Sequence, residues 1–347
     1  MTEQQFIREL ESALNQMSSE ERDDILADIR EYFISGREDG KMDGEIAASL
    51  GSPKDIAKDL LENYVPAPPQ FENSNELIHI PHADFSHINM DIDHGSLNVY
   101  PSSNDETYIE LVGESDKVEL TADVTHNTLN IRLKSKKLGF FSFIFMIKEL
   151  KVNVALPKKL YQSIVMKTDN GRIRAEKLLG KDIKVYSDNG AINLKELAAT
   201  MLETETDNGR IEIDKVQVEK LTATTDNGRI ELRNIEATEV HSETDNGRII
   251  MEYITGNITG KTDNGRIILL TSSLDNMIDL ETDNGSIQVE TETEPRNVSI
   301  HTKTDFGKID VFGENNSKTV FGEGINKVRL TTDNGRIIVA RRTGVSI

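Results

Sequence analysis

The stretch Asp169-Asn170-Gly171-Arg172-Ile173 recurs with small changes through the second half of the chain. Successive copies of its aspartate are 19, 19, 19, 19, 18, 20, 22 and 28 residues apart. A period of this length indicates a repeat architecture in which each unit packs against its neighbours. The further copies begin at Asp188, Asp207, Asp226, Asp245, Asp263, Asp283, Asp305 and Asp333, with a degenerate copy at Asp93.

Apolar and polar residues alternate on both sides of each turn, which is typical of strands. After Asp207 the apolar positions fall into short groups separated by bends, such as Ile211 with Ile213 and Val216 with Val218. This pattern predicts a mainly β chain: a single-stranded β-solenoid with coils of about 19 residues, preceded by a small all-α bundle. The alternative is an antiparallel meander with Asn-Gly hairpins. It is less favoured because only one such turn occurs per unit.

The turn residues are predicted to form a structural ladder from coil to coil. We expect Gly to supply a positive φ, Asn to bond its stacked copies, and Asp to accept hydrogen bonds from the backbone amides that follow. Ordinary backbone requirements would then explain their recurrence without an active site. The predicted ladder comprises Asp169, Asn170, Gly171, Asp207, Asn208, Gly209, Asp226, Asn227, Gly228, Asp245, Asn246 and Gly247.

An arginine follows most of these turns and would form a column of like charge. We expect the adjacent Asp to compensate each Arg, while a groove for an anionic polymer such as a teichoic acid or glycan is the alternative. Ala191, Ser286 and Lys308 interrupt the column, which weakens the binding interpretation. Its members are Arg172, Arg210, Arg229, Arg248, Arg266 and Arg336.

Residues 1–64 form a predicted acidic helical module, with 16 acidic and 7 basic residues. Phe6, Leu10 and Leu14 recur at helical spacing, and Gly51 is expected to end a short helix that starts at Asp43. Residues 65–75 are predicted to be a Pro-rich linker and residues 76–347 the solenoid, with regular coils from about 164.

Composition excludes several classes of function. The net charge of −20 argues against a nucleic-acid binder, and the absence of Cys excludes disulfides and thiolate metal sites. The start of the chain lacks the features of a signal peptide, and no apolar run is long enough for a membrane span. We therefore expect a cytoplasmic protein, or one attached to the membrane, with the cell surface as the alternative.

One segment, residues 138–147, holds four of the eleven Phe residues and is flanked by lysines. A basic-flanked aromatic loop can contact an anionic membrane or a partner, whereas the alternative is that the rings fill the core beside an irregular early coil. The predicted contact residues are Lys136, Lys137, Phe140, Phe141, Phe143, Phe145 and Lys148.

No catalytic, cofactor or metal residue is predicted. Four histidines, His79, His82, His87 and His94, lie within 16 residues, but their spacing matches no common zinc site. Asp recurs in every coil, so no carboxylate pair is singled out for glycan cleavage. A column of calcium ions along the stacked Asp and Asn side chains remains an alternative, although the known calcium-binding motifs are absent.

The repeated phrase and its period resemble the bacterial β-strand-repeat family of "putative adhesins", over roughly residues 76–347. The run Leu50-Gly51-Ser52-Pro53-Lys54-Asp55-Ile56-Ala57 resembles the HAAS-type helical segment. Together the two resemble envelope-stress proteins of the LiaX and YvlB type. This resemblance implies sensing or regulation of stress at the cell envelope. We expect a non-catalytic scaffold whose helical module binds a protein partner, with contact to a membrane surface or a partner through the aromatic segment at 138–147. The alternatives are a calcium-stabilised or glycan-binding adhesin and, less favoured, a polysaccharide-cleaving β-helix enzyme.

Overall fold

The computed structural model divides into two compact units, Met1–Glu72 and Asn73–Ile347. We call them the helical unit and the repeat unit. The predicted linker at 65–75 lies outside the described residues. The structure describes residues 1–14, 41–62, 76–81, 84–113, 118–135 and 150–342, together with residues 22, 25, 26, 29, 30, 32, 33 and 37.

The helical unit contains α1 (Glu3–Ala13), α3 (Asp43–Leu50) and α4 (Pro53–Glu62), with further helical residues between 22 and 37. The apolar residues at helical spacing face one small core, in which the rings of Phe6 and Phe33 pack edge to face, with centroids 5.5 Å apart. Its fully buried members are Phe6, Leu10, Leu14, Leu26, Phe33, Ile46 and Ala57.

The helix ends follow from local chemistry. The Thr2 side chain accepts a hydrogen bond from the Gln5 amide at 3.3 Å, which caps α1. Helix α3 ends at Leu50, where Gly51 has a φ of +88°, the left-handed conformation that favours glycine. Arg37 bonds Asp43 at 2.8 Å and also pairs with Glu3. The guanidinium holds the pKa of the Asp43 carboxyl below its usual value.

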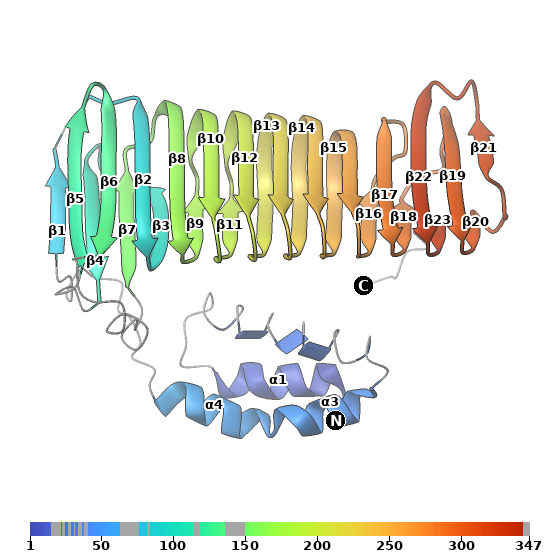
Figure 1. The fold of residues 1–347 in the computed structure, drawn as a ribbon, viewed down its shortest axis with the longest axis horizontal. Helices are drawn as coiled ribbons and strands as arrows, with labels where there is room; N and C mark the ends of the chain where they lie inside the picture. Colours follow the sequence, from blue (N-terminus) through green and yellow to red (C-terminus); the bar gives the residue numbers. More distant parts are fainter. Residues whose placement is uncertain are drawn as a thin grey trace. The chain divides into compact units, whose positions relative to one another are not determined.

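The middle of the repeat unit is a stack of parallel coils, visible as successive rungs in Figure 1. Like residues of neighbouring coils pair directly, for example Ile211 with Ile230, and Ile230 with Ile249. This register confirms the β-solenoid. The strands are β8 (Leu160–Asn170), β9 (Ile173–Glu176), β10 (Leu179–Ser187), β11 (Ile192–Lys195), β12 (Ala198–Thr206), β13 (Ile211–Thr225), β14 (Ile230–Thr244), β15 (Ile249–Thr262), β16 (Ile267–Thr271), β17 (Ile278–Asn284) and β18 (Ile287–Thr291).

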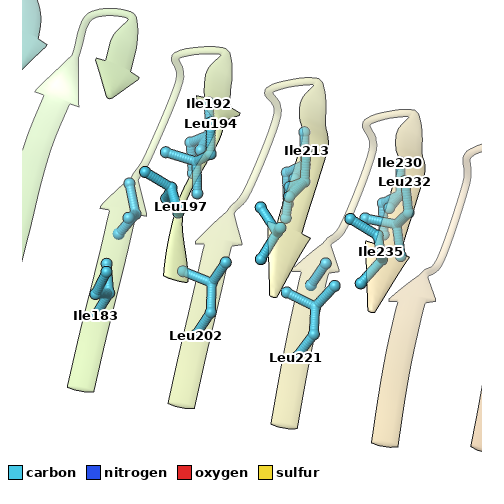
Figure 2. Close-up of a cluster of buried hydrophobic side chains, with 14 of the residues drawn as sticks. Ile183, Ile192, Leu194, Leu197, Leu202, Ile213, Leu221, Ile230, Leu232 and Ile235 are labelled. Carbon is cyan, nitrogen blue, oxygen red and sulfur yellow. The ribbon is translucent and has the colours of Figure 1, made fainter. Parts of the chain in front are cut away.

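Pairing within a coil runs in three segments. Between β13 and β14 the paired residues are 211–214, 216–218 and 220–225, and the register omits Lys215 and Glu219. Inward residues of all three segments are buried and line one continuous core, as Figure 2 shows for Leu221, Leu232 and Ile235. Each large aliphatic side chain buried in this way stabilises the fold by roughly 1.5–3 kcal/mol. The aliphatic repeat therefore replaces a globular core rich in aromatics.

The first end of the stack departs from the repeat. The coil formed by β2 and β3 stacks in parallel on β8 and β9, while β5 and β6 form an antiparallel hairpin beside it. The hairpin turn at His126 and Asn127 has positive φ at both residues, as a tight two-residue turn requires. The strands are β1 (Glu76–Ile80), β2 (His87–His94), β3 (Ser96–Pro101), β4 (Thr107–Val112), β5 (Val118–Thr125), β6 (Thr128–Ser135) and β7 (Lys151–Leu156).

At the other end the coils do not stack in sequence order. Strand β22 pairs with β17 on one side and β19 on the other, so the last coil is inserted between two earlier ones (Figure 1). The copy at Asp333 therefore follows Asp283 in space, and the copy at Asp305 comes last. This order corrects the expectation that successive copies are always neighbours. The strands are β19 (Val298–Phe306), β20 (Ile309–Val311), β21 (Lys318–Phe321), β22 (Asn326–Asn334) and β23 (Ile337–Arg341).

Candidate functional site

The turn glycines form a column in which each backbone touches the next. None of the nine glycines of the Asp-Asn-Gly type turns from Gly171 to Gly335 has a positive φ, so the predicted reason for glycine is wrong. A methyl group on Gly228 would instead lie 1.8 Å from the carbonyl oxygen of Gly209, and the same clash recurs in every coil. Glycine is required by the close approach of the coils.

Hydroxyl and amide side chains bond the same turns together. Thr225 donates to the carbonyl of Gly209 and accepts from the amide of Gly228, each at 3.1 Å. The Asn side chains bond one another in an unbroken ladder from Asn170 to Asn334. Among the described residues, the Asp carboxylates make no hydrogen bond to the following amides. At three turns the hydroxyl before the Asp, from Ser187, Thr206 or Thr225, accepts this amide hydrogen bond in place of the carboxylate.

Two arginines of the column pair with a different carboxylate from the expected one. Arg210 pairs with Glu212 at 3.1 Å and Arg229 with Glu231 at 2.7 Å, each two residues further along the chain. At Arg210 and Arg229 the partner is this Glu and not the adjacent aspartate. Glu231 is almost fully buried in this network, which also includes Arg233. The arrangement is a local ion-pair network across neighbouring coils.

The structure does not test the predicted aromatic contact segment. The aromatic segment with Lys136, Lys137, Phe140, Phe141, Phe143, Phe145 and Lys148 lies outside the described residues. His79 stacks on Tyr108 and lies 3.0 Å from Glu106, at an exposed edge. His94 pairs in register with Asn170. Within the described ranges, no three His, Asp or Glu side chains gather as metal ligands.

A second corner of each coil carries the left-handed backbone. The φ angle there lies between 53° and 57°, although no residue at this position is a glycine. Non-glycine residues adopt this conformation at a cost of roughly 1–2 kcal/mol. The stacking of the coils imposes the conformation. The corner therefore accepts side chains of different kinds. The corner residues are Lys177, Glu196, Lys215, Asn234 and Tyr253.

A pocket of about 330 Å³ opens at the first of these corners, and we call it the lysine pocket. It lies between the turn from β7 to β8 and the corner from β9 to β10. Three lysines and one glutamate stand beside a wall of apolar side chains. The lining residues are Pro101, Leu156, Pro157, Lys158, Lys159, Tyr161, Lys177, Leu178, Leu179 and Glu196.

Buried aromatic rings fix the back of the lysine pocket. The hydroxyl of Tyr161 donates to the carbonyl of Pro157 at 2.9 Å, and burial raises the pKa of this phenol. The Lys159 ammonium lies 4.6 Å from the centre of the Phe85 ring and 5.4 Å from that of Tyr161. Sequence reasoning missed this pocket. The signal was the run Pro157-Lys158-Lys159-Leu160-Tyr161, which breaks the regular repeat.

The groove continues along the corner into the next coils, where it becomes polar. A second hollow, of about 370 Å³, lies there, and Glu196 is the one residue that lines both it and the lysine pocket. Two of its polar side chains are engaged: Gln217 bonds Glu236, also in the lining, at 2.9 Å, and Asn234 bonds the neighbouring Asp214 at 2.8 Å. The lysine pocket is therefore the apolar end of the groove. The hollow is lined by Glu196, Leu197, Ala198, Lys215, Val216, Gln217, Asn234 and Glu236.

Comparison with known families agrees with this geometry. The model of the Toastrack DUF4097 family matches residues 85–340, which is most of the chain. The chain belongs to the Toastrack DUF4097 family. A second model, HAAS, matches residues 5–59, so the repeat unit is a Toastrack unit that follows a HAAS segment. No curated protein matches the chain.

Solved structures with similar chains share low identity with the Toastrack protein. A putative adhesin from Bacteroides fragilis is 16% identical, with a TM-score of 0.43. A putative lipid binding protein from Parabacteroides distasonis is 15% identical, with a TM-score of 0.32, and a putative cell adhesion protein from Clostridium sporogenes is 12% identical, with a TM-score of 0.20. Each match covers 77% of this chain and 98% of the other. No helix in the described residues is long and apolar enough to cross a membrane.

Proposed function

We propose that this protein is a non-catalytic scaffold, in which the Toastrack unit is a rigid support and the helical unit binds a protein partner. The observation that carries the proposal is the continuous bonding of repeated Gly, Thr and Asn residues from coil to coil. These residues serve the contact between coils, so their recurrence needs no catalytic explanation. A stiff stack of this kind suits the display of a surface over several coils.

The charge of the helical unit supports a protein partner. Residues 1–64 contain 16 acids against 7 bases, and this unit has its own small core. An acidic surface on a compact module favours a partner with a basic patch, since complementary charge speeds encounter and excludes wrong partners. Partner recognition would then reside in the helical unit while the Toastrack unit positions it.

We further propose that this scaffold acts at the cell envelope, in sensing or regulating envelope stress. The support is the layout of the chain, in which a HAAS segment precedes a Toastrack unit. This layout resembles that of envelope-stress proteins. The protein would work in the cytoplasm, attached to the membrane through its partner or through a surface of its own.

A pull-down with the full chain tests the proposal. Glu9 and Glu11 are exposed on α1, and their double change Glu9→Lys plus Glu11→Lys reverses charge without touching the core. The matched control, Glu205→Lys plus Glu219→Lys, makes the same change on exposed positions of the Toastrack unit. We expect wild type and control to enrich the same membrane-extract protein, with binding to the helical-unit variant weaker by roughly tenfold. Identical enrichment by all three proteins would contradict the proposal.

A further inference from the structure

We propose that the lysine pocket is a binding site for a fatty acid anion of medium chain length. The acyl chain would lie against the apolar wall formed by Pro101, Pro157 and Leu179, and the carboxylate would lie among the lysine ammonium groups. This site is separate from the helical unit. It goes beyond the scaffold function and does not depend on it.

The apolar side of the pocket suits an acyl chain. Its volume of about 330 Å³ falls at the lower end of the range for small-molecule sites, roughly 300–1,000 Å³. Leu160 and Leu179 pair side by side on neighbouring coils and are 56% and 45% exposed. Two large apolar side chains left open beside a pocket would be covered by a ligand tail.

The charges around the pocket suit an anionic head. Lys158, Lys159 and Lys177 stand against a single carboxylate, that of Glu196, in a chain whose net charge is −20. Lys158 and Lys177 are exposed and form no ion pair with any carboxylate in the described part of the chain. Three cations beside an apolar wall are complementary to a molecule with one negative end and one apolar end.

The fold does not require a lysine at position 177. The equivalent corner position is filled in later coils by Glu196, Lys215, Asn234 and Tyr253, all with the same left-handed backbone. Since four residue types satisfy this corner, the backbone leaves its identity free. Lys177 is therefore available for a role in binding, together with Lys158 from the preceding turn.

A monomeric ligand fits these observations better than a membrane surface. The site is a small hollow and not a protruding loop, and the large negative charge of the chain opposes close approach to an anionic bilayer. A single acyl chain can enter without that approach. The occupant is thus a free fatty acid anion.

Calorimetric titration of the full-length protein with decanoate tests the proposal, with decan-1-ol and butyrate as the uncharged and the short-chain probes. Two variants alter the pocket at exposed positions: Lys158→Gln plus Lys177→Gln, and Leu179→Asp. The matched control is Lys308→Gln plus Lys318→Gln, which removes the same charge from exposed positions at the far end of the Toastrack unit. Thermal unfolding of each variant checks that the fold is retained.

We expect decanoate to saturate one site on the wild type and on the control. Affinity should fall by roughly tenfold in the double lysine variant and for decan-1-ol, and binding should be lost for Leu179→Asp and for butyrate. The proposal would be overturned if the wild type showed no saturable binding of decanoate, or if both pocket variants bound decanoate as tightly as the wild type does. Flotation of the protein with phosphatidylglycerol vesicles that persists at saturating decanoate would also overturn it, because the surface would then serve a membrane.

Discussion

Gly228 has an ordinary backbone conformation, and the carbonyl oxygen of Gly209 is what makes glycine necessary there. The left-handed conformation occurs instead at Lys215, where the side chain gains nothing from it. The familiar association of glycine with positive φ is therefore reversed within a single coil. Two substitutions with opposite expected signs follow from this reversal.

Replacement of Gly228 by Ala should destabilise the Toastrack unit by about 1–3 kcal/mol or more, because the added methyl group would force two coils apart. Denaturant unfolding measured by circular dichroism would show this loss. Gly44→Ala is the matched control, since a methyl group at that helical position meets nothing within 4 Å. It should leave the β transition unchanged, and an equally small effect at Gly228 would show that the coils are not in close contact.

Replacement of Lys215 by Gly should not destabilise the unit and should stabilise it by up to about 1 kcal/mol. Relief of the left-handed strain offsets the greater freedom of glycine in the unfolded chain. The matched control is Lys195→Gly, the same change within strand β11. It should lower the free energy of unfolding by roughly 1 kcal/mol. If both variants lost the same stability in denaturant titrations, the left-handed corner would not be strained.

At the scale of strands, the Asn ladder ends where the stack ends. Asn334 donates to Asn284 at 2.9 Å, and on its other side it pairs in register with Phe306. The outermost coil thus carries Phe where every inner coil from Asn170 onward carries Asn, and the ring of Phe306 is 78% exposed. The departure from the repeat falls at the position where no further coil follows.

Phe306→Asn should extend the ladder by one side-chain hydrogen bond. We expect a gain of roughly 0.5–1 kcal/mol in the free energy of unfolding, which is the net contribution of a typical intramolecular hydrogen bond. Asp305→Asn is the control, because it places the same side chain at the exposed neighbouring position outside the ladder. A loss of stability in the Phe306 variant, measured by denaturant unfolding, would contradict this account of the ladder.

The strands and their register could be predicted because alternation and identity repeat together, as in the pairing of Ile211 with Ile230. The hairpin of β5 and β6 could not be predicted, because antiparallel pairing takes the place of the repeated coil there. Nor could the lysine pocket be predicted, because its lining comes from segments around residues 101, 157, 178 and 196 that only the stacked coils bring together. The ion pairs of the arginine column were not predicted, because the Glu partner lies outside the repeated phrase, two residues beyond the Arg on the strand that follows.

At the scale of the whole Toastrack unit, the position of the last coil is the feature that sequence order conceals. The copies at Asp305 and Asp333 both fit the repeat, and only the longer intervals of 22 and 28 residues signalled a change. The inserted coil keeps the full phrase Asp333-Asn334-Gly335-Arg336, as a coil with neighbours on both sides requires. The outer coil has Phe306 and Lys308 in place of Asn and Arg.

Disulfide trapping tests the parallel stacking and this order most directly, because the chain has no native cysteine. Neighbouring strands are about 4.8 Å apart, within the Cα range that a disulfide spans, whereas positions two coils apart are separated by roughly 10 Å. Asn284→Cys plus Asn334→Cys should therefore cross-link on mild oxidation, and Asn284→Cys plus Phe306→Cys should not. Rapid cross-linking of the second pair, with none in the first, would contradict the stacking described here.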